Sequence, residues 1–218
     1  GKAPAGDTFT YKGGTIRLNE NKNAGIDVQG THMGSYNNIY QMKVINQGNI
    51  IGVGGNGKTE HAAFAFNNFD GSNDTTRVLL SNEGNIKLNA PTSAGMMLRP
   101  EINDALDHGL NMQMGQNSSD ITLNGRGSAG ITVVKNPNNP GGYNKTNYSV
   151  TVPFGGLLAS RSDEANKSGI SNTGTISIQS DDSVGVSILN TIQDVRVNGN
   201  VNVGTVDPST LGGANGAS

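Results

Sequence analysis

The chain of 218 residues contains no cysteine and no tryptophan, and aromatic residues make up 5% of it. Without cysteine it forms no disulfide and offers no thiolate to a metal ion. No apolar run approaches the roughly 18 residues that a membrane-spanning helix needs. The formal net charge is −2, so the chain as a whole has no excess of positive charge that would attract nucleic acid or an anionic membrane.

Two residue types are abundant instead, because glycine supplies 32 residues and asparagine 30. Only 33% of the residues are hydrophobic, a composition that is also typical of disordered chains. Here, however, isoleucine, leucine and glycine recur in register over most of the length. A solenoid reconciles the two observations, since its core is a thin column that needs few apolar residues per coil.

The recurring phrase reads Gly-x-Ile-x-Leu, followed after six residues by Ala/Val-Gly-Ile-x-Val. In four copies a glycine stands nine residues after the first isoleucine. These pairs are Ile16 with Gly25, Ile86 with Gly95, Ile121 with Gly130, and Ile176 with Gly185. A looser copy begins at Ile50 and has four extra residues before its second half. A period of 34 to 36 residues, with one longer gap, marks a repeat protein.

Each copy contains three short segments in which apolar and polar residues alternate, as in a strand with one buried face. The third segments are residues 42–44, 78–80, 110–112 and 192–197. The glycine of the second half suggests a tight corner. The sequence therefore predicts an all-β fold, a right-handed parallel β-helix (β-solenoid) with three short strands per coil and loop insertions. We expect the column to span 14–204, with a lead-in at 1–13 and a tail at 205–218.

Amide side chains recur in phase with the phrase. Four residues before the first isoleucine stand Asn46, Asn82, Asn117 and Asn172, and three residues after it stand Asn19, Asn89, Asn124 and Gln179. Stacked amides at one corner of a solenoid can hydrogen-bond along the column. We therefore interpret both sets, and the repeated glycines, as structural.

Three insertions interrupt the phrases, at 52–61, 99–108 and 135–171. The second has the pattern of a short helix. The third holds several of the scarce aromatic residues, and we take it as a candidate contact patch with the partner-binding residues Tyr143, Lys145, Tyr148 and Phe154. The alternative is a loop that packs its own side chains over the column.

Residues 52–59 fit the phosphate-binding pattern G-x-x-x-x-G-K-[ST]. A phosphate site of that type needs a helix beginning at Lys58, whereas the next segment, 62–66, stands where other copies place a strand. Asn- and Gly-rich loops produce such matches by chance, so we expect no nucleotide and no cofactor.

Other catalytic signals are weaker. The three histidines, His32, His61 and His108, share no evident phase, and we expect them to be solvated loop residues. The acid pairs at 163–164 and 181–182 have no partner acids in phase. A carbohydrate-active β-helix would stack acids over several coils, often around Ca²⁺. We therefore predict no catalytic and no metal-binding residue.

Three longer phrases carry a resemblance to a known family. They are Asn-x-Gly-Thr-Ile-x-Ile…Ser-Val-Gly-Val at 172–186, Ser-Ala-Gly-Met-Met-Leu at 93–98, and Ile-x-Leu-x-Gly-x-x-Ser-Ala-Gly-Ile-x-Val at 121–133. The chain resembles the passenger region of large Gram-negative autotransporters of the fusobacterial type. That resemblance implies a non-enzymatic piece of a longer β-helical passenger, displayed at the cell surface and anchored by an outer-membrane barrel that is not in this sequence.

The resemblance also implies a role in adhesion and virulence, through a protein or glycan receptor on host cells or other bacteria. It implies neither nucleic-acid binding nor insertion of this fragment into a membrane. Two alternatives stay open: a spacer that supplies only length, and a carbohydrate-active β-helix such as a lyase or a tailspike.

Overall fold

The computed structural model describes residues 7–29, 39–55, 57–67, 75–99, 112–134, 169–188 and 194–204. These residues form strands and connecting turns, without a helix. The strands are β1 (Asp7–Tyr11), β2 (Thr15–Leu18), β3 (Ala24–Gln29), β4 (Ile39–Asn46), β5 (Asn49–Gly52), β6 (Ala62–Asn67), β7 (Thr75–Asn82), β8 (Ile86–Leu88), β9 (Ala94–Arg99), β10 (Met112–Asn117), β11 (Asp120–Leu123), β12 (Ala129–Val133), β13 (Gly169–Asn172), β14 (Thr175–Ile178), β15 (Val184–Ile188), β16 (Asp194–Val197) and β17 (Asn200–Val203).

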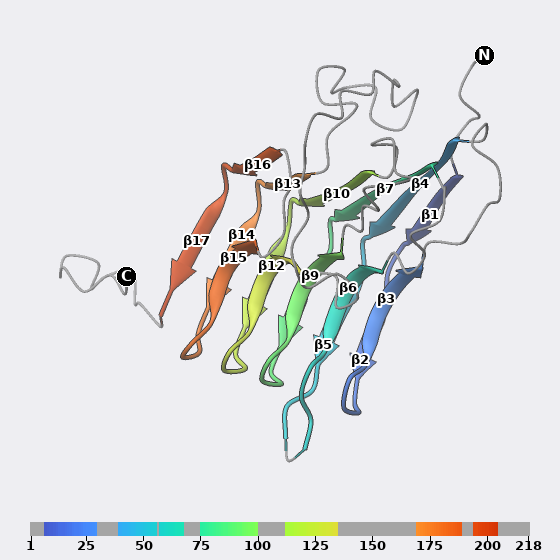
Figure 1. Ribbon diagram of the computed structural model, residues 1–218. Coiled ribbons are helices and arrows are strands. Elements are labelled where there is room, and N and C mark those ends of the chain that lie inside the picture. Colours follow the sequence, from blue (N-terminus) through green and yellow to red (C-terminus); the bar gives the residue numbers. More distant parts are fainter. Residues whose placement is uncertain are drawn as a thin grey trace.

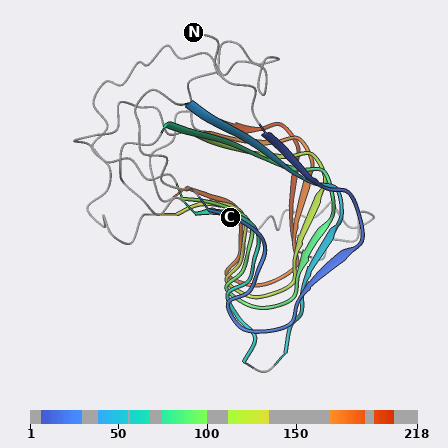
Figure 2. The same cartoon turned by 90° about the vertical axis from the view of Figure 1, so that its right-hand side faces the viewer.

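Every third strand belongs to the same sheet. Sheet A has the order β1-β4-β7-β10-β13-β16, sheet B runs from β2 to β17 as β2-β5-β8-β11-β14-β17, and sheet C is β3-β6-β9-β12-β15. All strand pairs are parallel, so each group of three consecutive strands is one coil stacked on the next (Figure 1). Viewed along the column, the coils superimpose (Figure 2). This is the arrangement of a parallel β-solenoid, as the repeat predicted.

The isoleucines that open the five copies stand in direct register in sheet B. Ile50, Ile86, Ile121 and Ile176 are each at most 1% exposed and form the axis of the core. The alternate residues of the same strands point outward, among them Lys87. Phe64, Met96 and Ile131 of sheet C and Leu80 of sheet A close the core from the other two sides. The strand register predicted from the period of the phrase is confirmed.

The first predicted amide row is also confirmed. Asn46, Asn82, Asn117 and Asn172 are buried at the ends of the sheet A strands. The Nδ2 of Asn46 donates to Oδ1 of Asn82 at 2.8 Å, and the next two steps have the same direction at 2.7 Å. Tyr11 and Val197 occupy the equivalent positions in the first and last coils, so the row ends within the column.

The second predicted row is interrupted. Asn124 Nδ2 donates to Asn89 Oδ1 at 2.7 Å, but Asn124 Oδ1 is buried without a hydrogen-bond partner. In the second coil Val53 takes the place of an amide, because its N–H bonds to Leu18 O just as Asn89 N–H bonds to Gly52 O. Asn19 is therefore separated from Asn89 by an apolar residue.

The repeated glycines are needed for a different reason from the one expected. Gly95 and Gly130 lie inside β9 and β12 rather than at a corner. A Cβ on Gly95 would lie 2.5 Å from the carbonyl oxygen of Gly130, and one on Gly130 would lie 2.6 Å from that of Gly185. These glycines permit close stacking of successive coils, which is a packing requirement and not a turn.

Two predicted boundaries need correction. Residues 1–13 include β1, which pairs with β4 and forms part of the first coil. The predicted insertion 135–171 ends earlier, because residues 169–172 form β13 and pair with β10. Both strands were missed since neither contains the repeated phrase. The expected helix within 99–108 lies outside the described residues, apart from Arg99 in β9. Among the described residues, no helix is long and apolar enough to cross a membrane.

Candidate functional site

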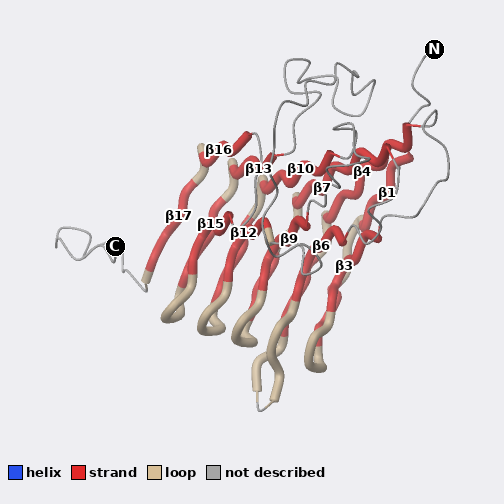
Figure 3. The backbone as a smooth tube through the Cα atoms, viewed as in Figure 1, coloured by secondary structure: helices blue, strands red, loops and turns tan. Residues whose placement is uncertain are grey.

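Of the two kinds of turn that the structure describes in the first five coils, apart from Asn56, those from sheet B to sheet C vary more in length than those from sheet A to sheet B. Five residues separate the two strands in four of the coils, and the first four of them, at 19–22, 89–92, 124–127 and 179–182, are here called the B–C corner. In the second coil it contains eight, residues 53–60. That corner extends beyond the stacked corners of the other coils (Figures 2 and 3). One coil of a regular column therefore presents a raised loop.

One backbone position of this corner is left-handed in all five coils. The φ angles are 57° at Lys22, 60° at Glu60, 52° at Thr92, 68° at Gly127 and 55° at Asp182. An L-residue in this conformation costs about 1–2 kcal/mol, which the coil-to-coil hydrogen bonds offset. The N–H of Glu60, for example, donates to Pro91 O at 3.0 Å. The shared backbone leaves the side chains free to vary, so the corner can carry a surface specific to each coil.

The next residue forms a second buried row, which the sequence analysis missed. The backbone N–H of Ser93 donates to Ser128 Oγ at 3.0 Å, and that of Ser128 donates to Ser183 Oγ at 3.0 Å. His61 stands in the same row, since its N–H donates to Ser93 Oγ at 3.1 Å. The signal was present in the tripeptides Ser-Ala-Gly at 93–95 and 128–130, which align with His61-Ala62-Ala63.

The prediction that His61 is a solvated loop residue is therefore wrong. Its side chain is buried, and its Nε2 lies 2.7 Å from the carbonyl oxygen of Glu20. Its Nδ1 has no hydrogen-bond partner among the described residues. Four extra residues precede His61 in its coil, so its distance from Ile50 differs from the distance between Ser93 and Ile86, and the sequence spacing did not align the two residues. His32 and His108 lie outside the described residues.

The imidazole of His61 lies beside Gly52. Gly52 holds the sheet B position that is Leu18, Leu88 or Leu123 in other coils. A Cβ on Gly52 would lie 2.7 Å from His61 Nδ1. The third and fourth coils have leucine and serine at these two positions, whereas the second coil has glycine and histidine.

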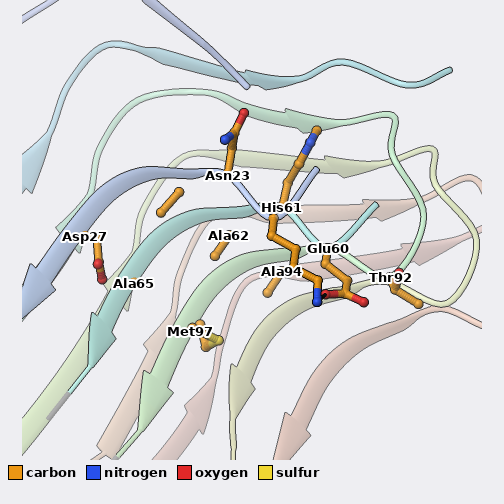
Figure 4. Close-up of a pocket in the computed structure, with 11 residues that line it drawn as sticks. Asn23, Asp27, Glu60, His61, Ala62, Ala65, Thr92, Ala94 and Met97 are labelled. Atoms are coloured by element: carbon orange, nitrogen blue, oxygen red, sulfur yellow. Dashed lines mark ion pairs between the residues drawn. The ribbon is translucent and has the colours of Figure 1, made fainter. Parts of the chain in front are cut away.

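A groove of about 430 Å³ lies beside this coil, over the starts of β3, β6 and β9. Ala24, Ala62 and Ala94 stand in register along it and form a floor of small side chains. Glu60 and Thr92 stand on the corner side, and Asp27 and Met97 on the opposite side (Figure 4). The groove therefore combines a narrow apolar floor with polar and charged rims.

The rims carry charges of both signs. Lys22 Nζ lies 3.4 Å from Glu60 Oε2, and both side chains are more than half exposed. Exposed pairs of this kind contribute little to stability, so both groups remain free to exchange partners. Thr59 Oγ1 donates to Asn21 Oδ1 at 2.7 Å, which holds the end of the raised loop against the first coil. A ligand in the groove would meet the Lys22 ammonium and the Glu60 carboxylate on the corner side and the Asp27 carboxylate on the opposite side.

A second ion pair joins the B–C corners of the fourth and fifth coils. Arg126 Nε donates to Asp182 Oδ2 at 2.6 Å. This hydrogen bond and the charge of Asp182 raise the pKa of Arg126, so the guanidinium stays charged. Asp182, one of the adjacent acids in the sequence, therefore pairs with a cation of the preceding coil. Asp163 and Glu164 lie outside the described residues.

The phosphate-binding pattern at 52–59 forms part of the raised corner and leads into β6, a strand. Gly55 and Gly57 have positive φ angles of 136° and 75°, as in a surface turn. Within the described part of the chain, no group of three or more His, Asp or Glu side chains is placed to hold a metal ion. The predicted contact residues Tyr143, Lys145, Tyr148 and Phe154 all lie outside the described residues.

The described site therefore differs from the predicted one in position and in chemistry. It is a raised corner with a charged groove, formed by the second coil and its neighbours, and no phenylalanine or tyrosine is among the residues that line the groove. No known protein family matches the chain, and no curated protein or solved structure shows significant similarity to it.

Proposed function

We propose that this chain is a non-enzymatic segment of a cell-surface adhesin, of the kind carried by Gram-negative autotransporters. In this role the column is a rod that holds loops away from the outer membrane, where they bind a receptor on host cells or on other bacteria. Solenoids suit this task because a stack of similar coils gives length at constant cross-section. Binding segments then lie on the variable loops of a fixed scaffold.

The observation that carries the proposal is that, within the described part of the chain, the irregular features are concentrated at one coil. The raised corner 53–60, the glycine–histidine exchange and the adjacent groove all belong to the second coil or touch it. A spacer needs no such coil, since its coils supply only length. A contact surface does need one, because specificity requires a site that differs from its neighbours.

The test compares three proteins in a cell-binding assay with host cells and with neighbouring bacterial species. The first is the unaltered chain. In the second, the raised corner is made identical to that of the third coil: residues 53–60 are replaced by Asn-Ala-Pro-Thr, together with Gly52→Leu and His61→Ser. In the third, residues 136–147 are replaced by a short Gly/Ser linker. Far-UV circular dichroism checks that all three stay β-rich.

We expect the unaltered chain to bind and the corner-exchanged chain to lose binding. Loss on replacing 136–147 instead would keep the adhesin and move its site to the long insertion. Absence of binding by the unaltered chain on every cell type tested would contradict the adhesin proposal and favour a spacer. A milder variant, Glu60→Lys, reverses one rim charge and should weaken binding without removing the loop.

A further inference from the structure

Two cations stand in one row on the outer face of sheet B. Arg17, Ile51 and Lys87 are register partners in β2, β5 and β8, the sheet B strands of the first three coils. Each follows an isoleucine that points inward, so its own side chain points outward. Arg17 and Lys87 are exposed, and Ile51 between them is half-buried. Among the described residues, neither cation has an ion pair.

The cations of the B–C corner behave differently, since Lys22 pairs with Glu60 and Arg126 pairs with Asp182. Within the described strands of sheet B, Asp120 is the one outward-pointing acid, and it belongs to the fourth coil. The first three coils therefore present an acid-free surface with two cations, although the chain has a net charge of −2. We call this surface the basic strip, and its outward residues are Thr15, Arg17, Asn49, Ile51, Asn85 and Lys87.

The basic strip adjoins the raised corner. Ile51 is the residue before Gly52, the last residue of β5, and the raised corner 53–60 follows directly. This corner supplies a third cation, Lys58, which likewise has no ion pair among the described residues. The coil with the raised corner is thus the coil that lies between the two cations of the strip.

From this charge pattern we infer that the basic strip binds an acidic polysaccharide that lies along the column. The inference deepens the adhesive role proposed above, and rests on it, because it names the chemical class of the receptor. Two coils separate Arg17 from Lys87, which is about 9.6 Å at the usual strand spacing. A linear polysaccharide with one sulfate or carboxylate per disaccharide presents anions at a comparable interval, since one sugar unit spans about the height of one coil.

The uncharged residues of the strip suit such a ligand. Asn49 and Asn85 are exposed and precede the core isoleucines of their strands, so they lie beside the cation row. An amide both donates and accepts hydrogen bonds, as sugar hydroxyl groups do. The described strands of sheet B contain no aromatic residue on which a neutral sugar could stack. Charge and hydrogen bonds are therefore the means of recognition that this face offers.

An acidic peptide is the alternative ligand, and the strip suits it less well. Peptides commonly bind a sheet by adding a strand to a free edge. Here β5 pairs with β2 and β8, and β8 also pairs with β11, so neither strand has a free edge. A peptide would reach only the side chains of the strip, and its carboxylates would accept hydrogen bonds without donating any.

The first experiment measures binding of the purified chain to fluorescent heparin, a sulfated and carboxylated polysaccharide, by anisotropy at low ionic strength. Neutral dextran and poly-glutamate are the comparison ligands. We expect the chain to bind heparin, to bind it less as salt is added, and to bind neither comparison ligand appreciably. Absence of heparin binding would overturn the inference. Equal binding of poly-glutamate would overturn it as well, because the strip would then respond to negative charge alone.

The second experiment locates the binding surface with single substitutions. Arg17→Gln and Lys87→Gln should each weaken heparin binding by about two- to fivefold, the range for an exposed charge pair. Lys43→Gln is the matched control, since it removes the same charge from the outer face of sheet A and should leave binding unchanged. Ile51→Lys completes the row of cations and should tighten binding, a gain that misfolding cannot produce. Circular dichroism checks that each variant is folded.

Equal weakening by Lys43→Gln and Lys87→Gln would contradict the assignment to the basic strip, and so would an Ile51→Lys chain that binds no more tightly. Cell binding in the presence of soluble heparin separates this inference from the adhesive role. A chain that binds cells but not heparin would refute the polysaccharide inference and keep the adhesin. A chain that binds heparin through the strip but binds no cell type would support the inference and contradict the adhesin.

Discussion

The imidazole of His61 packs against Gly52, where a Cβ would lie 2.7 Å from His61 Nδ1 and 2.9 Å from Leu88 Cδ2. The two residues come from opposite sides of the raised corner, at the end of β5 and just before β6. The positions of Leu88 and Ser93 in the third coil show what the second coil has exchanged. Relative to the third coil, the second coil has a smaller residue at the leucine position (Gly52) and a larger one at the serine position (His61), so the two changes in side-chain volume offset each other.

This relationship predicts strong coupling between the two positions. Gly52→Leu alone would drive a side chain into the imidazole and should destabilise the fold by about 1–3 kcal/mol. His61→Ser alone would leave a cavity and should cost a similar amount. The double variant restores the leucine-and-serine pair of other coils and should be more stable than either single variant. Denaturant unfolding of the four proteins gives the coupling free energy, and additive effects would contradict the exchange.

The amide row predicts that an interior asparagine matters more than an exposed one. Asn117 accepts from Asn82 and donates to both Asn172 Oδ1 and Ser119 O. Asn117→Ala would leave buried partners unpaired and should lower the free energy of unfolding by about 2–4 kcal/mol. Asn49→Ala changes an exposed asparagine of β5 and should stay within about 0.5 kcal/mol of the wild type. Equal effects of the two substitutions in urea titrations would mean that the row does not stabilise the column.

The left-handed corner predicts a stabilising substitution. Thr92 is β-branched and has a φ of 52°, a conformation in which such residues are rare. Thr92→Gly should relieve this strain and stabilise the chain by up to about 1 kcal/mol after the entropy cost of glycine. Thr92→Ala keeps a Cβ and should give no such gain. A melting temperature that is higher for the glycine variant than for the alanine variant is the expected result.

The register of sheet B predicts opposite tolerances at adjacent positions. Ile121 is fully buried, so Ile121→Asp should bury an unpaired charge and cost more than about 4 kcal/mol, enough to prevent folding. Thr122→Asp places the same charge on the outer face and should leave a folded, β-rich protein. Circular dichroism of the two purified variants compares them directly. A folded Ile121→Asp chain would contradict the inward direction of this row.

Much of the fold could be predicted because the solenoid repeats its contacts. The spacing of Ile86, Ile121 and Ile176 was sufficient to place them in one column, and the phase of Asn82 and Asn117 was sufficient to pair their amides. In both cases one residue type meets itself in the next coil. Residues one period apart in the sequence are therefore neighbours in space, so the period alone predicts which residues of successive coils pair.

The candidate site could not be predicted in the same way, because it consists of departures from the repeat. Because four extra residues precede His61, the spacing found in the other coils does not align it with Ser93. Gly52 gave no signal of its own, since a missing side chain is visible only against its register partners. The alanine floor of the groove does follow the repeat, because Ala24, Ala62 and Ala94 hold one position of the phrase, but Glu60 on its rim belongs to the raised corner. Aromatic residues of 135–171 attracted attention instead because they are rare in this chain.

The amide row has one further consequence, which concerns how such a rod can change its length. The three amide bonds between coils run in one direction, so Asn82 and Asn117 each donate to the coil after them and accept from the coil before them. A tandem duplication of residues 86–120 would insert one more asparagine into this series without creating an unpaired amide, and would lengthen the rod by about 4.8 Å. Rod length is thus a quantity that duplication and deletion can adjust coil by coil, while the raised corner of the second coil stays unchanged.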